Sequence, residues 1–291
     1  MKLKMKWVGM LAGVLITLLV AGVAMAAGTT DWEKGSVQAD GYGAAPAGVT
    51  GVGSSRVMAR RAAIVDAYRN LAEYVQGVQV DATTTVRDMA VASDVVRTQV
   101  SAMVRGAQVV AEDMGPDGSY HVRLAVPLYG VSGSLASAVL PENLKPEAFP
   151  EPQAVAPAPT VPSADTTGSS AAPVPPGVLL PAVGTYTGLI VDCRGMELRP
   201  AMSPVIKDAA GTPIYGYKNL VSSQVIASGM AAYAREMDGA VRAGTNPLVV
   251  KAQSLADHNA NPVLSAEDAS KVLVENRASG FLDHCAVVFL R

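Results

Sequence analysis

The chain has 291 residues, a formal net charge of -2 at pH 7 and only 5% aromatic residues. This length suits two modest domains, and the low aromatic content favours small aliphatic cores over a large aromatic pocket. Outside the first residues the sequence has no block rich in lysine or arginine, so nucleic acid is not expected as a partner.

The first 26 residues have the order of a secretory signal peptide. Three lysines precede an uncharged run, residues 7–23, and the small residues Ala24 and Ala26 follow it. An uncleaved anchor is the alternative, because the run approaches the length of a membrane span. We expect cleavage after Ala26 and a periplasmic or peripheral outer-membrane location. The first cysteine is Cys193, so no direct lipid anchor is expected.

A proline-rich stretch divides the chain. Residues 141–181 hold 11 of its 19 prolines, and proline both fixes φ and removes a backbone donor. The predicted organisation is therefore a signal peptide over 1–26, an α+β domain over 27–140, a disordered Pro/Ala-rich linker over 141–182, and a second α+β domain over 183–291. Both domains are expected to pack helices on mainly antiparallel sheets.

In the first domain the sequence predicts a strand from Ser36, a helix over 56–76 and a strand over 78–86. The helix is predicted to end on a left-handed Gly77, and its apolar positions recur at helical spacing. The predicted core face of this helix consists of Val57, Ile64, Tyr68, Leu71 and Val75.

The rest of the domain is predicted as a helix over 93–105 and a hairpin over 107–128. Val96, Val100 and Met103 recur at helical spacing in the first, and Gly115 to Gly118 form the turn of the second. The predicted order is strand, helix, strand, helix, hairpin.

Three stretches of this domain carry a resemblance to a known family. They read "RRAAIVDAYRNLAEYVQGVQVDATTTV", "MVRGAQVV" and "GSYHVRLAVPL". Together, residues 36–130 resemble the bacterial envelope family of LPP-twenty lipoproteins and the similar N-terminal domain of flagellar assembly protein T. The resemblance implies a small α+β domain at or near the outer membrane, with a structural or assembly role and no catalytic residues.

The second domain is predicted from alternating apolar runs and turn signals. Apolar runs predict strands near 185–193, 246–255 and 281–291, and a hairpin is expected over 204–216. A helix is expected within 221–242. Ser265 and Asp268 resemble a capping box that opens another helix through Arg277.

Few residues carry chemistry. His121 is expected to be a solvated strand residue and His258 a loop residue, and His284 precedes Cys285. Cys193 and Cys285 form a candidate disulfide, with two separately buried thiols as the alternative. Adjacent strand residues point to opposite faces, which argues against a shared metal site. No catalytic, cofactor or metal site is predicted.

The function that these observations favour is a non-enzymatic envelope protein with a structural or assembly role that binds other envelope proteins, and the resemblance suggests flagellar assembly as its narrower form. A second copy of the chain is a further candidate partner. Arg60, Arg61 and Arg69 are the candidate partner surface, because they lie largely off the apolar helix face. The alternatives are a periplasmic module that binds a cell-wall or small-molecule ligand and an uncharacterised enzyme.

Overall fold

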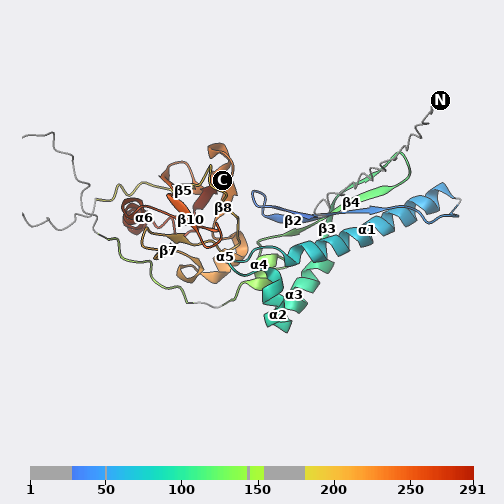
Figure 1. The fold of residues 1–291 in the computed structure, drawn as a ribbon, viewed down its shortest axis with the longest axis horizontal. Helices are drawn as coiled ribbons and strands as arrows, with labels where there is room; N and C mark the ends of the chain where they lie inside the picture. Colours follow the sequence, from blue (N-terminus) through green and yellow to red (C-terminus); the bar gives the residue numbers. More distant parts are fainter. Residues whose placement is uncertain (1–27, 50, 143–144, 154–180) are drawn as a thin grey trace, which may run out of the picture.

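The structure is a computed structural model that describes residues 28–49, 51–142, 145–153 and 181–291. Within these ranges the chain forms two α+β units, as the sequence predicts. Figure 1 shows them side by side along the long axis, with α4 (Leu135–Val139) and α5 (Ser222–Ser228) where they meet. None of the helices in the described ranges is long and apolar enough to cross a membrane. The predicted signal peptide lies outside the described residues.

A four-stranded antiparallel sheet forms the N-terminal unit, and the long helix α1 (Val52–Gln76) covers one of its faces (Figure 1). Alternate residues of the two central strands are buried, which is the pattern of strands with one face on a core. The predicted first strand and hairpin are confirmed. The strand order is β1-β2-β4-β3, with β1 at Gly28–Asp31, β2 at Ser36–Gly43, β3 at Gln108–Met114 and β4 at Tyr120–Pro127.

Helix α1 approaches β2 closely because small residues meet at their contact. A Cβ atom at Gly41 would lie only 2.2 Å from the backbone nitrogen of Ala67, and one at Gly43 would lie 2.3 Å from the carbonyl oxygen of Ala59. Only glycine therefore fits at these two positions of β2. The buried face of the helix repeats every four residues and consists of Ala59, Ala63, Ala67, Leu71 and Val75.

This face differs from the predicted one. Leu71 and Val75 are buried as expected, but Ile64 and Tyr68 are only partly buried and Val57 is 59% exposed. The prediction followed the bulkiest apolar residues. The close approach of β2 instead selects alanines, since larger side chains would hold the helix away from the sheet.

The segment after α1 folds back on itself instead of continuing as a strand. Gln79 pairs with Thr85 in an isolated antiparallel bridge. Between them the Asp81 carboxylate accepts a hydrogen bond from the backbone N–H of Thr84 at 2.9 Å, as aspartate does in tight turns. The predicted strand over 78–86 is therefore wrong, because its alternating pattern belongs to the two arms of a turn.

Two short helices follow this turn. Gly77 ends α1 with φ of -86°, so the predicted left-handed cap is wrong. Helix α2 (Val86–Ala92) begins at a capping box of Thr85 and Asp88 that the sequence analysis does not identify. Helix α3 (Asp94–Arg105) confirms the predicted helix and ends at Gly106.

Two further sheets form the C-terminal unit. In the parallel sheet β8-β12-β5-β9, strands β5 and β12 are apolar runs buried on both faces, as parallel sheets require. Its strands are β5 (Gly188–Asp192), β8 (Ala232–Ala234), β9 (Pro247–Lys251) and β12 (Val287–Leu290). The mixed sheet β10-β11-β6-β7 holds β6 (Ile206–Lys207), β7 (Pro213–Tyr215), β10 (Ser254–Ala256) and β11 (Asn261–Val263).

Most predicted elements of this unit are present, but the strand expected over 246–255 divides into β9 and β10, and the strand expected over 281–291 is reduced to β12 because residues 281–285 form a turn. Helix α6 (Ala266–Ser279) begins at Ser265, whose hydroxyl accepts a hydrogen bond from the Asp268 N–H at 2.9 Å. The helix expected within 221–242 is confirmed only for α5. It ends at Gly229, whose φ of +77° suits glycine. Strand β8 and two 3-10 turns, Met237–Gly239 and Val241–Ala243, follow, and a third such turn spans Tyr217–Asn219.

The first described part of the predicted linker is not disordered. Residues 145–153 lie on the C-terminal unit: the Glu147 N–H donates to the Lys218 carbonyl at 2.8 Å, and the Ser270 hydroxyl donates to the Gln153 carbonyl at 2.7 Å. This corrects the prediction for that part, because a proline-rich chain can be ordered by neighbours that satisfy its remaining polar groups. Residues 143–144 and 154–180 lie outside the described residues.

The described residues before and after 154–180 contact the same helix of the C-terminal unit. Before it, Gln153 contacts Ser270 on α6, and after it the N–H groups of Val183 and Gly184 donate to the carboxylate of Glu275 on the same helix, at 2.8 and 2.9 Å. These bonds satisfy a carboxylate that is only 2% exposed. The described residues on both sides of 154–180 thus belong to the C-terminal unit.

The two units contact each other directly. The Ser203 N–H donates to the Val80 carbonyl in the turn after α1, and the Gly130 N–H donates to the Ile226 carbonyl in α5, both at 2.8 Å. Buried apolar residues of both units belong to one continuous cluster. The prediction of two domains separated by a spacer thus misses a direct interface, in which backbone hydrogen bonds join the two units.

Candidate functional site

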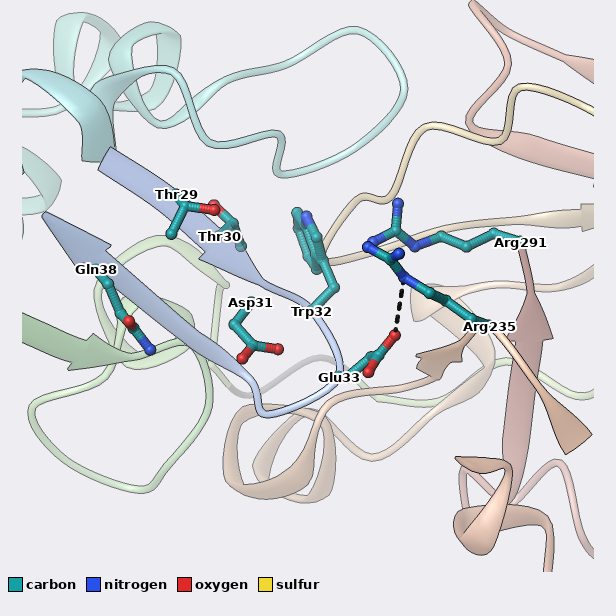
Figure 2. Close-up of a pocket in the computed structure, with 8 residues that line it drawn as sticks. All are labelled: Thr29, Thr30, Asp31, Trp32, Glu33, Gln38, Arg235 and Arg291. Atoms are coloured by element: carbon teal, nitrogen blue, oxygen red, sulfur yellow. Dashed lines mark ion pairs between the residues drawn. The ribbon is translucent and has the colours of Figure 1, made fainter. Parts of the chain in front are cut away.

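A cavity of about 290 Å³ lies where the β1–β2 hairpin meets the C-terminal unit. Figure 2 shows the two sides of this cavity, with the hairpin residues on one and two arginines on the other. A cavity between two packed units is a common place for a ligand site. Its lining consists of Thr29, Thr30, Asp31, Trp32, Glu33, Gln38, Arg235 and Arg291.

The C-terminal side of the cavity is built on the carboxyl edge of the parallel sheet. Arg235 directly follows β8 and Arg291 directly follows β12, and these strands pair in parallel with Leu290 beside Ala234. The two arginines therefore leave the sheet at the same edge. Open α/β sheets bind their ligands outside this edge, because the strands deliver loop side chains there together.

The N-terminal side of the cavity is the turn between β1 and β2. The indole of Trp32 packs edge-on against the ring of Tyr233, with 5.5 Å between ring centres. The Glu33 carboxylate lies 3.6 Å from Nε of Arg235 (Figure 2). Asp31 is engaged within its own turn, where it accepts a hydrogen bond from the Lys34 N–H at 2.9 Å. The hairpin thus adds one aromatic wall and one carboxylate facing the arginines.

Charge in the cavity is not fully balanced. Nε of Arg291 is buried and has no hydrogen-bond partner among the described residues. Asp31 lies 3.8 Å from the Lys34 ammonium, so its charge is already compensated. Glu33 pairs with Arg235, whereas Arg291 has no ion pair among the described residues. The arrangement can hold one further anionic group, because arginine forks bind carboxylates and phosphates in pairs of hydrogen bonds.

A second polar cluster lies on the sheet face opposite α1. Nδ1 of His121 is 2.9 Å from Asp113 and its Nε2 is 2.7 Å from Asp40, while Nε of Arg123 donates to Asp40 at 2.8 Å. Tyr42 stacks on the imidazole with 4.8 Å between ring centres. Carboxylates only accept hydrogen bonds, so an imidazolium that donates from both nitrogens satisfies this arrangement.

The charges of this cluster stabilise one another. The hydrogen bond to Asp113 raises the pKa of His121, burial lowers it, and the bond to Asp40 raises it further, with a net increase. Burial alone would raise the pKa of Asp40, but hydrogen bonds from Arg123 and His121 outweigh it and lower the value. His121 points away from the core as predicted, yet its side chain is only 19% exposed. All its polar atoms are engaged, so the cluster ties three strands together.

The three arginines of the predicted partner surface do not gather on one surface. Arg60 pairs with Glu112 on β3 at 2.8 Å, whereas Arg69 pairs with Asp66 within α1. At about 100° per residue, Arg60 and Arg69 lie on opposite sides of the helix. Arg61 is exposed between them. The set spreads over half the circumference of the helix, and its role as a partner surface stays a prediction.

The predicted disulfide is not formed, and both cysteines are buried free thiols. Cys193 follows β5 and donates its N–H to the Leu290 carbonyl at the far end of β12, while Cys285 precedes β12. At about 3.3 Å per residue along parallel strands, the cysteines lie roughly 15–20 Å apart. A disulfide requires Cα atoms within about 7 Å. The parallel register that separates them was not visible in the sequence.

Sequence reasoning missed the residues that line the cavity. Arg235 and Arg291 were not selected, because the sequence does not reveal that β8 and β12 are neighbours. Trp32 offered a signal, since Trp7 and Trp32 are the only tryptophans of the chain. His258 and His284 lie in loops as isolated residues, and the described residues contain no group of three or more His, Cys, Asp or Glu that could hold a metal ion.

Comparisons with known proteins give one match for each unit. A comparison with curated proteins found no match. The family model for the second domain of Treponema pallidum Tp0624 matches residues 188–291, and the model for LPP20 lipoprotein matches residues 31–126. Each match covers about a third of the chain. The N-terminal unit, over residues 31–126, is thus similar to LPP20 lipoprotein.

Proposed function

We propose that this chain is a non-enzymatic, exported cell-envelope protein with a structural or assembly role, and that it binds other envelope proteins. The similarity to LPP20 lipoprotein supports an envelope-associated protein, and the signal-peptide pattern of residues 1–26 supports export. The chain has no cysteine before Cys193, which is buried, so the proposal includes no direct lipid anchor. The compartment is the periplasm or the periphery of the outer membrane.

The observation that carries this proposal is the free edge of the N-terminal sheet. Strand β3 is the last strand of the sheet, and all seven of its residues are exposed. Val109, Val110 and Met114 on this strand are each 43–54% exposed. Among the described residues no strand pairs with the outer side of β3, so away from the bulge between Val109 and Ala111 this edge offers backbone groups to a strand of another chain.

On the opposite side of the sheet, the part of β2 that extends beyond β1 is occupied by helix α1, in contrast to the β3 edge. Beyond its pairing with β1, strand β2 has its Tyr42 N–H bonded to Asp66 at 3.1 Å, and its Asp40 carbonyl accepts a hydrogen bond from the Asn70 amide at 2.8 Å. Side chains of α1 therefore occupy this edge, as proteins do to prevent unwanted pairing. The proposed partner adds a strand to β3, and a second copy of the chain is one candidate.

The test compares two valine-to-lysine variants in the tagged full chain, isolated from the envelope of its host. Val110→Lys places a charge on the β3 edge, and Val65→Lys makes the same change on α1, where Val65 is 69% exposed. We expect Val110→Lys to lose co-isolated envelope proteins that the wild type and Val65→Lys retain. Sedimentation of the purified chains shows whether the partner is a second copy. Unchanged partners with Val110→Lys would contradict the proposal.

The proposal excludes catalysis, and two observations support this. Both nitrogens of His121 are engaged by carboxylates, so the ring lacks a free base. Burial raises the pKa of the Cys193 thiol to about 12, and burial also raises that of Cys285, which suits neither thiol to nucleophilic attack. Turnover of a cell-wall substrate by the purified chain would contradict this part of the proposal.

The narrower form of the proposal is a role in flagellar assembly, which rests on the sequence resemblance to flagellar assembly protein T. In a flagellated host, deletion of the gene is then expected to impair motility, and Val110→Lys is expected to reproduce the defect at normal protein levels. Normal motility of the deletion strain would contradict the flagellar role but not the broader envelope role.

A second candidate function is a module that binds a small ligand. The cavity between the hairpin and the parallel sheet supports it, because polar groups and an aromatic ring converge there. The two candidates use different surfaces. Variants of the cavity should therefore leave partner binding at β3 unchanged if the first proposal is right.

A further inference from the structure

We infer that the cavity at the carboxyl edge of the parallel sheet binds a small molecule through a carboxylate group held by Arg235 and Arg291. The inference is independent of the proposed partner binding at β3. It follows from where the two arginines lie, from the charge that their surroundings leave uncompensated, and from the size of the cavity.

The positions of the arginines favour a shared anionic ligand. They extend from adjacent parallel strands and line one cavity, where Figure 2 shows both side chains directed toward the hairpin. Two neighbouring guanidinium groups repel each other unless an anion lies between them. Glu33 lies 3.6 Å from Arg235, but Nε of Arg291 is buried without a partner among the described residues. The site thus has at least one guanidinium N–H group that is free to bind an anion.

The charge balance favours a single negative charge. The cavity is lined by two arginines and two acidic residues, but Asp31 is compensated by Lys34 outside the lining. Glu33 pairs with Arg235, so Arg291 is the arginine of the lining that has no ion pair among the described residues. A carboxylate supplies one negative charge and matches the planar fork of arginine, whereas a phosphate monoester carries nearly two.

The remaining lining indicates the body attached to this carboxylate. At about 290 Å³ the cavity has the volume of roughly ten water molecules. The Trp32 indole supplies an apolar wall, and Thr29 and Gln38 supply neutral polar groups. A small apolar group next to a carboxylate fits this lining, as at the carboxyl terminus of a short peptide.

The experiment uses the fluorescence of Trp32 in the full chain. Trp7 and Trp32 are the only tryptophans, and the exported chain is proposed to begin after Ala26, so Trp32 is its single reporter inside the cavity. The probes are N-acetyl-Ala-Leu with a free carboxylate, the same peptide as its C-terminal amide, and phenyl phosphate. We expect the acid to bind at least about tenfold more tightly than the amide, because the arginine bonds are charge-assisted.

Three variants assign the binding to this site. Arg235→Gln and Arg291→Gln are each expected to weaken binding of the acid by about tenfold, while Arg199→Gln, an exposed arginine outside the lining, is the matched control. Arg235 is 77% exposed, so its replacement is expected to leave folding intact. If Arg291→Gln is unstable, the affinity of Arg235→Gln for the acid therefore shows whether the arginines bind it. Glu33→Gln removes the competing carboxylate and is expected to tighten binding about two- to fivefold, which loss of folding could not do.

The outcomes separate this inference from its alternatives. Equal affinity for the acid and the amide, or no fluorescence change with any probe, would overturn it. Tighter binding of phenyl phosphate would overturn the assignment to a carboxylate. If Arg235→Gln did not weaken binding of the acid, the acid would bind outside this cavity and the inference would be wrong. None of these results bears on partner binding at β3, because Val110 does not line the cavity.

Discussion

Replacing Gly41 with alanine tests the close approach of α1 to the N-terminal sheet. The added Cβ would lie 2.2 Å from the nitrogen of Ala67, 2.3 Å from the oxygen of Ala63 and 2.6 Å from the Cα of Ala67. These are backbone atoms, so no side-chain rotation relieves the clash. Ordinary contact begins near 3.4 Å, and the helix must therefore move by about 3.4 - 2.2 = 1.2 Å.

The expected cost follows from this displacement. Overpacking of a tight core destabilises by about 1–3 kcal/mol, and we expect the upper end because the obstacle is rigid backbone on both sides. For a unit of this size, about 3 kcal/mol corresponds to a decrease in melting temperature of roughly 12–24 °C. The measurement is thermal unfolding followed by circular dichroism, with urea unfolding as a second measure of the free energy.

Gly53→Ala is the matched control. Gly53 lies in the first turn of α1, and a Cβ there would meet no atom within 4 Å. Alanine favours the helix over glycine by up to about 1 kcal/mol, so this variant is expected to melt at or slightly above the wild-type temperature. If Gly41→Ala melted within about 2 °C of the wild type, the proposed contact between β2 and the alanine face of α1 would be refuted.

Three further predictions test other parts of the fold. Asp113 and Asp40 raise the pKa of His121 in the folded protein, so the stabilisation of the fold by this imidazolium is present below a pH of about 6.5 and is lost as the pH rises through the pKa of the folded protein. His121→Gln should therefore lower the melting temperature more at pH 6 than at pH 9. An equal decrease at both pH values would disprove the paired imidazolium. Cys193 and Cys285 should react with an alkylating agent only after unfolding, and mass measurement of exported protein should find both thiols free, whereas a bridge would show that the parallel register is wrong. A protease site inserted between residues 160 and 170 should yield two fragments that co-elute in gel filtration without a disulfide, because residues 145–153 and the backbone bonds between the units hold them together; separate elution would disprove that interface.

Local interactions explain what the sequence by itself determined. Helix α3, the β3–β4 hairpin and the start of α6 at Ser265 were predicted from periodicity, turn residues and a capping pattern within a few neighbouring positions. Strand β5 was predicted because a short apolar run requires burial wherever it lies. The resemblance to LPP-twenty lipoproteins, confirmed for residues 31–126, likewise depends on local patterns.

Only the tertiary structure decided features that depend on which segments are neighbours. The alternating residues 78–86 form a turn because Gln79 and Thr85, in the two arms of the segment, pair with each other. The alanine face of α1 is buried because glycines on β2 permit close contact, which helical periodicity does not encode. The parallel register of β5, β8 and β12 separates Cys193 from Cys285. The same register brings Arg235 and Arg291 together. Parallel strands pair across long stretches of chain, so their neighbours are fixed by packing of the whole unit and not by any local pattern.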